Sequence, residues 1–133
     1  MKTLHLNLIK IWFDKILSKE KKEEYREVKP FWCSRFLIYE GKHRSVKWWT
    51  LFFHHESDPT EAIIELIKFG DIDFKEFNTI TFSNGMKPIE ILPRFEIELK
   101  GIEIDFGVSE WGAKDHTKYF VIKLGTAIDK TKK

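Results

Sequence analysis

The chain has 133 residues, of which 42% are hydrophobic and 15% are aromatic. This length and composition are typical of one folded domain and exclude an intrinsically disordered protein. Cys33 is the single cysteine, so an internal disulfide is excluded, and no apolar run reaches the ~20 residues that a membrane-spanning helix needs. Polar residues interrupt the apolar positions near the N-terminus, so we expect no signal peptide and a cytoplasmic location.

Charge is distributed unevenly along the chain although the formal net charge is only +2. Residues 1–50 contain 12 Lys and Arg against 6 Asp and Glu, whereas residues 51–133 contain 11 against 15. A basic first third favours a groove wall that attracts phosphate. Ordinary solvated lysines and glutamates explain the same counts equally well.

The first third of the chain shows three periodic segments. Residues 3–8 alternate apolar and polar side chains, which predicts a strand, and residues 9–17 carry an apolar stripe at helical spacing that ends near Ser18. Residues 22–28 are predicted to form a second strand, because Pro30 disfavours helical geometry in the residue before it. Residues 31–56 are rich in aromatic side chains without a clear period, so helix and strand both stay open there.

A capped helix is predicted after Asp58. Asp58 has the character of an N-cap, Pro59 suits the first helical position, and Glu61 stands three residues after the cap. Gly70 marks the end of this helix. The buried stripe is expected to consist of Ala62, Ile63, Leu66 and Ile67.

The second half of the chain is predicted to be mainly β-structure. Residues 79–83 alternate, and Asn84-Gly85 then favours a turn. Residues 95–106 also alternate, but their apolar set changes from odd to even positions at Gly101, which predicts a β-bulge in a long curved strand.

A last strand is predicted over residues 119–124, followed by a frayed tail over residues 129–133. Together these elements predict an α+β fold, a small and partly closed mixed β-barrel of five to six strands with two to three flanking helices.

Residues 19–26, Lys-Glu-Lys-Lys-Glu-Glu-Tyr-Arg, resemble the G-x-K-x-x-E-x-R motif of the ASCH domain family. Lys21, Glu24 and Arg26 match the motif, whereas Lys19 occupies the position of its glycine. Four further segments are similar to stretches of small bacterial and phage ASCH proteins: residues 25–32, 79–85, 110–113 and 119–125.

The resemblance implies a PUA-like barrel and an RNA- or nucleotide-binding cleft at its mouth, with no cofactor. It covers most of residues 1–133 as a single domain, in which residues 40–75 are expected to be an insertion that carries the capped helix. In the resembled fold the Asn84 turn lies near the cleft, and Trp111 is a candidate for stacking on a base.

The side chains of the motif also suggest a ligand-binding site independently of the resemblance. Glu24 and Arg26 are two residues apart on a predicted strand, so their side chains share one face roughly 7 Å apart. Arg26 offers a planar fork of donors, Glu24 accepts from an amine, and Lys21 adds an ammonium group, a set that suits a nucleotide. The alternative is an exposed edge strand protected by charge.

Some members of the resembled family are enzymes. Small ASCH proteins hydrolyse the amide of acetylated cytidine with a lysine, a threonine and a glutamate, and others are described as ribonucleases. Lys21 matches that lysine, Glu24 stands at the threonine position, and Glu110 is the positional candidate for the glutamate. In such a reaction Glu24 or Glu110 would be the base, and Lys21 or Arg26 would stabilise the oxyanion.

Other residues support weaker alternatives. A basic and aromatic cluster at residues 42–49 suits contact with unpaired bases, although core packing of the rings explains it better. Residues 31–53 are also compatible with a protein-interaction adaptor. His54 and His55 lack a second ligand pair, so no metal site is predicted, and Cys33 is expected to pack in the core. The sequence leaves the oligomeric state open.

Overall fold

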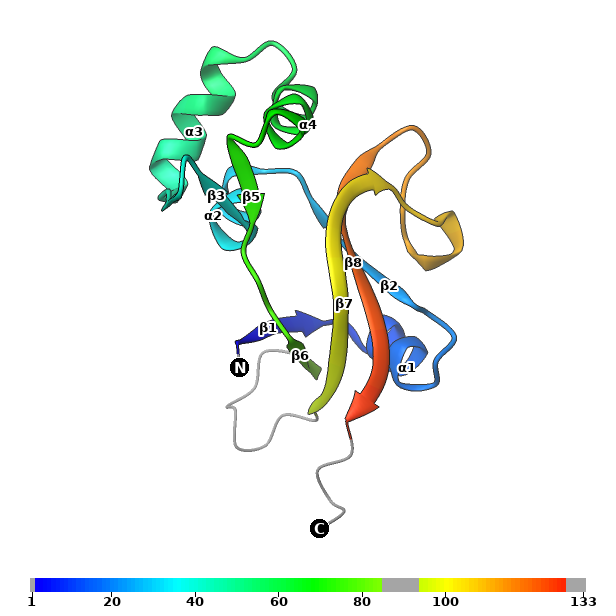
Figure 1. The fold of residues 1–133 in the computed structure, drawn as a ribbon. Coiled ribbons are helices and arrows are strands. Elements are labelled where there is room, and N and C mark those ends of the chain that lie inside the picture. Colours follow the sequence, from blue (N-terminus) through cyan, green and yellow to red (C-terminus); the bar gives the residue numbers. More distant parts are fainter. Residues whose placement is uncertain (1, 85–93, 129–133) are drawn as a thin grey trace.

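The computed structural model describes residues 2–84 and 94–128 (Figure 1). Within these ranges the chain forms four α-helices and eight strands. In chain order they are β1 (Thr3–Leu8), α1 (Lys10–Leu17), β2 (Glu23–Glu27), α2 (Pro30–Phe36), β3 (Leu37–Tyr39), β4 (Lys42–His43), α3 (Val46–His55), α4 (Pro59–Phe69), β5 (Ile72–Phe74), β6 (Thr79–Asn84), β7 (Arg94–Phe106) and β8 (Lys118–Ile128).

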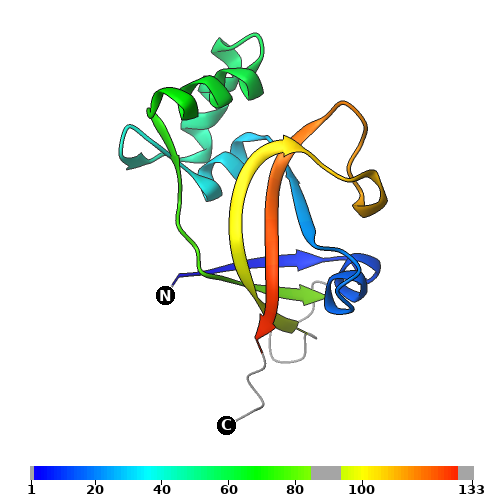
Figure 2. The same ribbon diagram turned by 45° about the vertical axis from the view of Figure 1, so that its right-hand side comes forward.

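Five strands form one curled sheet in the order β1-β6-β7-β8-β2 (Figures 1 and 2). β1 pairs with β6 in parallel, and the other neighbours are antiparallel. The sheet curls into a half-barrel whose two edge strands are β1 and β2. The predicted α+β class and the partly closed barrel with flanking helices are therefore confirmed.

A second, smaller sheet has the order β4-β3-β5 and lies with α3 and α4 at one end of the molecule (Figure 1). Two of its strands, β3 and β4, come from the aromatic segment that carried no clear period, and β5 follows α4. That segment folds as α2, β3, β4 and α3, elements of two to ten residues. Elements this short do not repeat a period often enough to be recognised, which explains why neither helix nor strand was predicted there.

The capped helix is confirmed as α4. The Glu61 main-chain nitrogen donates to Asp58 Oδ1 over 3.2 Å, and Pro59 is at the first helical position. Gly70 ends the helix with a φ of 87°, in the left-handed region that glycine tolerates. Of the predicted stripe, Ile63 is fully buried. None of the helices in the described ranges is long and apolar enough to cross a membrane.

The bulge in the long strand is confirmed as well. The pairing of β7 with β8 shifts register between Ile97 and Gly101. β8 continues to Ile128, beyond the predicted end at residue 124, because it still pairs with β7 there, opposite Glu96. Asn84 ends β6, and the rest of the predicted turn and the tail at 129–133 lie outside the described residues.

The alternation of the first strand directs Leu4, Leu6 and Leu8 into the core. From α1, Phe13 and Ile16 are buried, whereas Ile9 and Leu17, predicted on the same stripe, are 64% and 50% exposed. The first helix thus packs through a narrower face than its sequence predicts. The other fully buried large side chains are Phe36, Leu37, Trp49, Ile63, Ile72, Ile80, Phe82, Phe120, Val121 and Ile122.

Candidate functional site

Three charged side chains of the predicted motif meet at the start of β2. Glu24 Oε1 lies 3.1 Å from Lys21 Nζ, and Glu24 Oε2 lies 2.9 Å from Arg26 Nη2. The exposed fractions of these side chains are 7% for Glu24, 2% for Lys21 and 18% for Arg26. The spacing on β2 and the turn before it therefore bring the three groups together, and one carboxylate holds both cations in place.

The turn that delivers Lys21 begins at the end of α1. The main-chain nitrogens of Glu20 and Lys21 both donate to the Lys15 carbonyl. Between them and the helix, Lys19 has a φ of 68°, in the left-handed region. Lys19 thus adopts the conformation that glycine, the motif residue at this position, takes without steric cost.

The Lys21 ammonium is enclosed by aromatic rings and a carbonyl group. It donates to the main-chain carbonyl of Trp111, and it lies 4.2 Å from the ring centre of Trp12 and 5.3 Å from that of Tyr25. Burial lowers the pKa of Lys21, while the neighbouring Glu24 carboxylate opposes this effect. Lys21 therefore also ties β2 to a segment 90 residues further along the chain.

Arg26 faces a different part of the fold. Its Nη2 donates to the Asn7 carbonyl of β1 over 2.9 Å, and its guanidinium lies 4.9 Å from the ring centre of Trp32. Burial lowers the pKa of Arg26, and its Nε is buried without a hydrogen-bond partner among the residues described. Arg26 does not line the cleft where it was expected to bind a ligand, because its side chain fills the seam between the edge strands.

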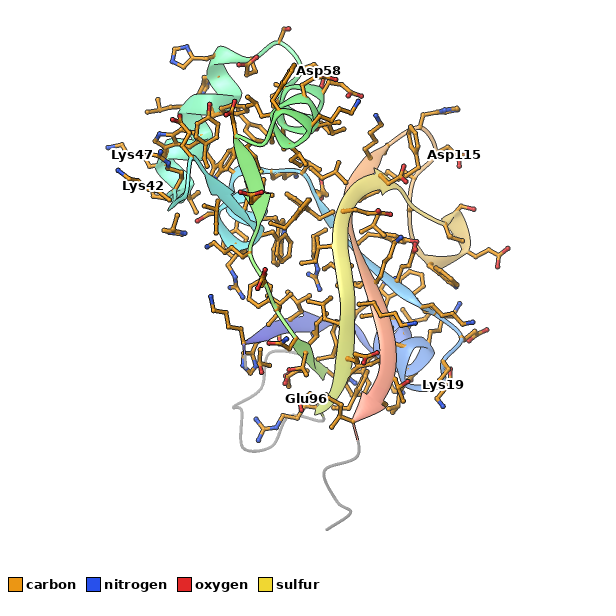
Figure 3. All side chains as sticks on the ribbon, in the orientation of Figure 1. Lys19, Lys42, Lys47, Asp58, Glu96 and Asp115 are labelled. Atoms are coloured by element: carbon orange, nitrogen blue, oxygen red, sulfur yellow. The ribbon has the colours of Figure 1, made fainter. Side chains whose placement is uncertain are left out.

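A cleft of about 550 Å³ lies on the other side of the ion triad. Its walls come from α1, β2, the connection between β7 and β8, and the start of α4. Figure 3 labels Asp58 at the start of α4 and Asp115 in that connection. The charged lining residues are Lys21, Glu24, Glu27, Lys29, Lys114 and Lys118, and the aromatic ones are Trp12, Tyr25, Trp111 and Tyr119.

Lysines outnumber glutamates in this lining by four to two. At the outer part of the cleft, Lys29 pairs with Glu27 at 3.0 Å and Lys118 pairs with Glu61 of α4 at 2.7 Å. Lys114 is exposed and forms no ion pair with any carboxylate that the structure describes. The cleft therefore combines an excess of positive charge with several ring faces.

Trp111, one of the predicted ligand-binding residues, lines the cleft from a 3₁₀ turn over Ser109–Trp111. The turn ends at Gly112, which has a φ of 103°. A β-carbon at Gly112 would stand 3.0 Å from the Trp12 ring, so the glycine permits the close approach of the turn to α1. This contact forms the end of the cleft next to Lys21.

Two other predicted site residues do not reach the cleft. Glu110 is exposed on the 3₁₀ turn and is not among the lining residues, and Asn84 lies at the end of β6 opposite Leu8. Of the proposed catalytic set, Lys21 and Glu24 form an ion pair and line the cleft, whereas Glu110 is not among the lining residues. Both carboxylate oxygens of Glu24 contact cations, Oε1 the Lys21 ammonium and Oε2 the Arg26 guanidinium.

Most of the cleft lining was missed by sequence reasoning. Trp12 was visible only as part of the apolar stripe over residues 9–17, and Tyr25 was not among the predicted site residues. The Tyr25 hydroxyl donates to Glu23 Oε1 and accepts from the Val108 main-chain nitrogen, and burial raises the pKa of Tyr25. Lys114 and Lys118 carried no signal at all, since nothing in their local sequence shows which surface they reach.

The remaining candidates occupy other parts of the molecule. The Arg44 guanidinium lies 5.0 Å from the ring centre of Trp48 and 5.7 Å from that of Tyr39. One cation of the basic and aromatic cluster thus already makes cation–π contacts within the protein. Cys33 is fully buried, as expected for a packing residue. In residues 2–84 and 94–128, no three His, Cys, Asp or Glu side chains are grouped to hold a metal ion.

The chain matches no protein-family model, no curated protein and no solved structure. The resemblance to ASCH domains stays a prediction that rests on the sequence segments described above.

Proposed function

We propose that the protein binds RNA or a nucleotide-like ligand in the cleft beside Lys21. The observation that carries this proposal is the convergence of four lysines and four aromatic rings on one cleft of about 550 Å³. Positive charge attracts phosphate, and ring faces accept bases of any sequence. The resemblance to ASCH domains supports the same class of ligand independently of this geometry.

The lysines of the cleft differ in how freely they can reach a phosphate. Exposed Lys114 forms no ion pair with a described carboxylate and can approach an entering phosphate directly, whereas exposed Lys29 and half-buried Lys118 would exchange their ion pairs with Glu27 and Glu61 for it. Lys21 is buried, and its hydrogens are taken by Glu24, the Trp111 carbonyl and the Trp12 ring. We assign phosphate attraction to the outer lysines and the positioning of the two tryptophans to Lys21.

Trp111 is the best candidate for stacking on a base. Its carbonyl is fixed by Lys21, while its half-buried side chain lines the cleft. Stacking of one base on an aromatic side chain is worth about 1–3 kcal/mol. Trp111→Ala keeps the carbonyl and hence the Lys21 contact, so it removes the ring without removing the anchor.

The test is titration of the protein with AMP, CMP, GMP and UMP, followed by tryptophan fluorescence and calorimetry. We expect saturable binding of at least one nucleotide, and a loss of about 10-fold or more in affinity for Trp111→Ala and for the Lys29→Gln, Lys114→Gln double variant. Lys42→Gln with Lys47→Gln is the matched control, because both lysines are exposed and lie away from the cleft (Figure 3). If no nucleotide binds at millimolar concentration, or if the control loses as much affinity, the proposal is wrong.

A further inference from the structure

A second, smaller cleft of about 260 Å³ lies beside the turn that follows α1. It is formed by the end of α1, the bulged part of β7 and the last residues of β8. Lys21 belongs to the linings of both clefts, so the two lie on either side of the same turn. Its lining includes Lys19, Lys21 and Lys22 of the turn, Lys100 of β7 and Gly125 of β8.

Lysine dominates the charge of this smaller cleft. Four of its lining residues are lysines, and no described Asp or Glu is among them. Lys19, Lys22 and Lys100 are exposed and form no ion pair with a carboxylate in the described part of the chain. By contrast, Lys21 of this lining and five lysines outside it do form such pairs, the five being Lys10, Lys29, Lys68, Lys118 and Lys123.

Two local irregularities of the chain meet at this cleft. Lys19 lies in the turn with positive φ, and Lys100 lies within the register shift of β7. A regular helix end and a regular strand would not produce this arrangement. We call this smaller cleft, with its exposed residues Lys19, Lys22 and Lys100, the lysine cleft.

We infer that the lysine cleft binds backbone phosphates of a single-stranded RNA whose unpaired base occupies the cleft beside Lys21. This inference rests on the proposed function and specifies it: the ligand is a single strand, and a second cleft binds its backbone. Unpaired bases stack on aromatic side chains, whereas the bases of a duplex are stacked on one another and cannot enter a cleft. Lys21 borders both clefts. An RNA strand that leaves the cleft beside Lys21 and crosses the turn therefore reaches Lys19, Lys22 and Lys100 next.

The test compares UMP with a fluorescein-labelled oligouridylate of about ten nucleotides, a length within the usual range for single-strand sites. The key variant is Lys19→Gln, Lys22→Gln, Lys100→Gln. We expect its affinity for the oligonucleotide to fall by about 10-fold or more, and its affinity for UMP to stay unchanged. The slope of log K against log salt concentration should become shallower by about 2, since each phosphate contact on a single strand contributes about 0.7.

The matched control is Lys42→Gln, Lys47→Gln, Lys68→Gln, which changes the net charge equally on the helical end of the molecule. Lys19 and the pair Lys42 and Lys47 lie on opposite sides in Figure 3. Glu98→Gln should have the opposite effect on affinity, because it removes a negative charge that lies against Gly125 of the lysine cleft. It should tighten oligonucleotide binding.

Each outcome decides between the two proposals. Equal losses in both triple variants mean that net charge alone acts and overturn the inference. An oligonucleotide that binds no more tightly than UMP overturns it as well, and leaves the nucleotide proposal standing. Failure of all four nucleotides to bind the parent protein counts against the cleft beside Lys21, whereas a triple variant of Lys19, Lys22 and Lys100 that binds the oligonucleotide as tightly as the parent protein counts only against the lysine cleft.

Discussion

Arg26 Nη2 donates a hydrogen bond to the Asn7 carbonyl over 2.9 Å, and this bond connects the two edge strands of the curled sheet. β2 carries Arg26 and β1 carries Asn7, and the two strands are not paired with each other. The half-barrel is therefore bridged at its open seam by a side chain that also stacks on Trp32 of α2.

Arg26→Met should lower the free energy of unfolding by about 3 kcal/mol or more. Methionine keeps an apolar stem, but it leaves Glu24 without one of its two cations in a buried site. Urea denaturation followed by circular dichroism measures the change. The control is Arg35→Met, because exposed Arg35 also donates to a carbonyl of β1, at His5, but over 3.4 Å. This change should cost less than about 1 kcal/mol, and equal losses would contradict a special role for the seam bond.

Glu24→Gln should be more damaging than its isosteric shape suggests. The change leaves Lys21 and Arg26 as buried cations without a counter-charge, which typically costs about 3–5 kcal/mol. Glu27→Gln on the same strand is the control, because Glu27 pairs with Lys29 at the exposed surface and should change stability by less than about 1 kcal/mol. Similar denaturation midpoints for the two variants would show that the buried carboxylate does not stabilise the fold.

Lys19→Gly should raise the free energy of unfolding by about 0.5–1 kcal/mol. A left-handed backbone costs a non-glycine residue about 1–2 kcal/mol, and the greater freedom of glycine in the unfolded chain offsets part of that gain. Lys22→Gly tests the reverse case. Lys22 does not have a positive φ, so glycine there should destabilise the protein by roughly 0.5–1 kcal/mol. Thermal unfolding of both variants measures the difference. A loss of stability in Lys19→Gly would show that the left-handed backbone at Lys19 is not strained.

Cys33 should make stability depend on pH in the alkaline range. Burial raises the pKa of the Cys33 thiol from its ordinary value of 9.0 to about 12. Between these values the unfolded chain has lost the thiol proton while the folded chain retains it. The unfolded state then binds fewer protons, so stability is fully present below pH 9 and falls as pH rises towards 12.

The measurement compares urea unfolding of the parent protein and Cys33→Ala at several pH values. The free-energy difference between them should change by roughly 1 kcal/mol per pH unit above pH 9, because only the parent carries the thiol. Other groups that titrate in this range contribute equally to both proteins and cancel. Parallel pH profiles would show that the thiol ionises as readily in the folded state as in the unfolded state.

Local sequence patterns were sufficient for the elements that are specified by near neighbours. The alternation of residues 3–8 predicted β1, the Asp58 cap and Gly70 predicted α4, and the change of apolar face at Gly101 predicted the bulge in β7. The spacing of the motif likewise predicted that Glu24 and Arg26 share a face. In each case the physical cause acts over a few residues, through side-chain period, capping or backbone conformation.

Only the tertiary structure decided what these elements enclose. It placed Trp111 against Lys21 across 90 residues, directed Arg26 to the seam, and left Glu110 and Asn84 outside the cleft. The same holds for the cleft walls, since α1, the β7–β8 connection and the start of α4 meet only after the sheet has curled. A sequence fixes which face of a strand a side chain occupies, but the partner of that face depends on long-range packing, which leaves no local pattern.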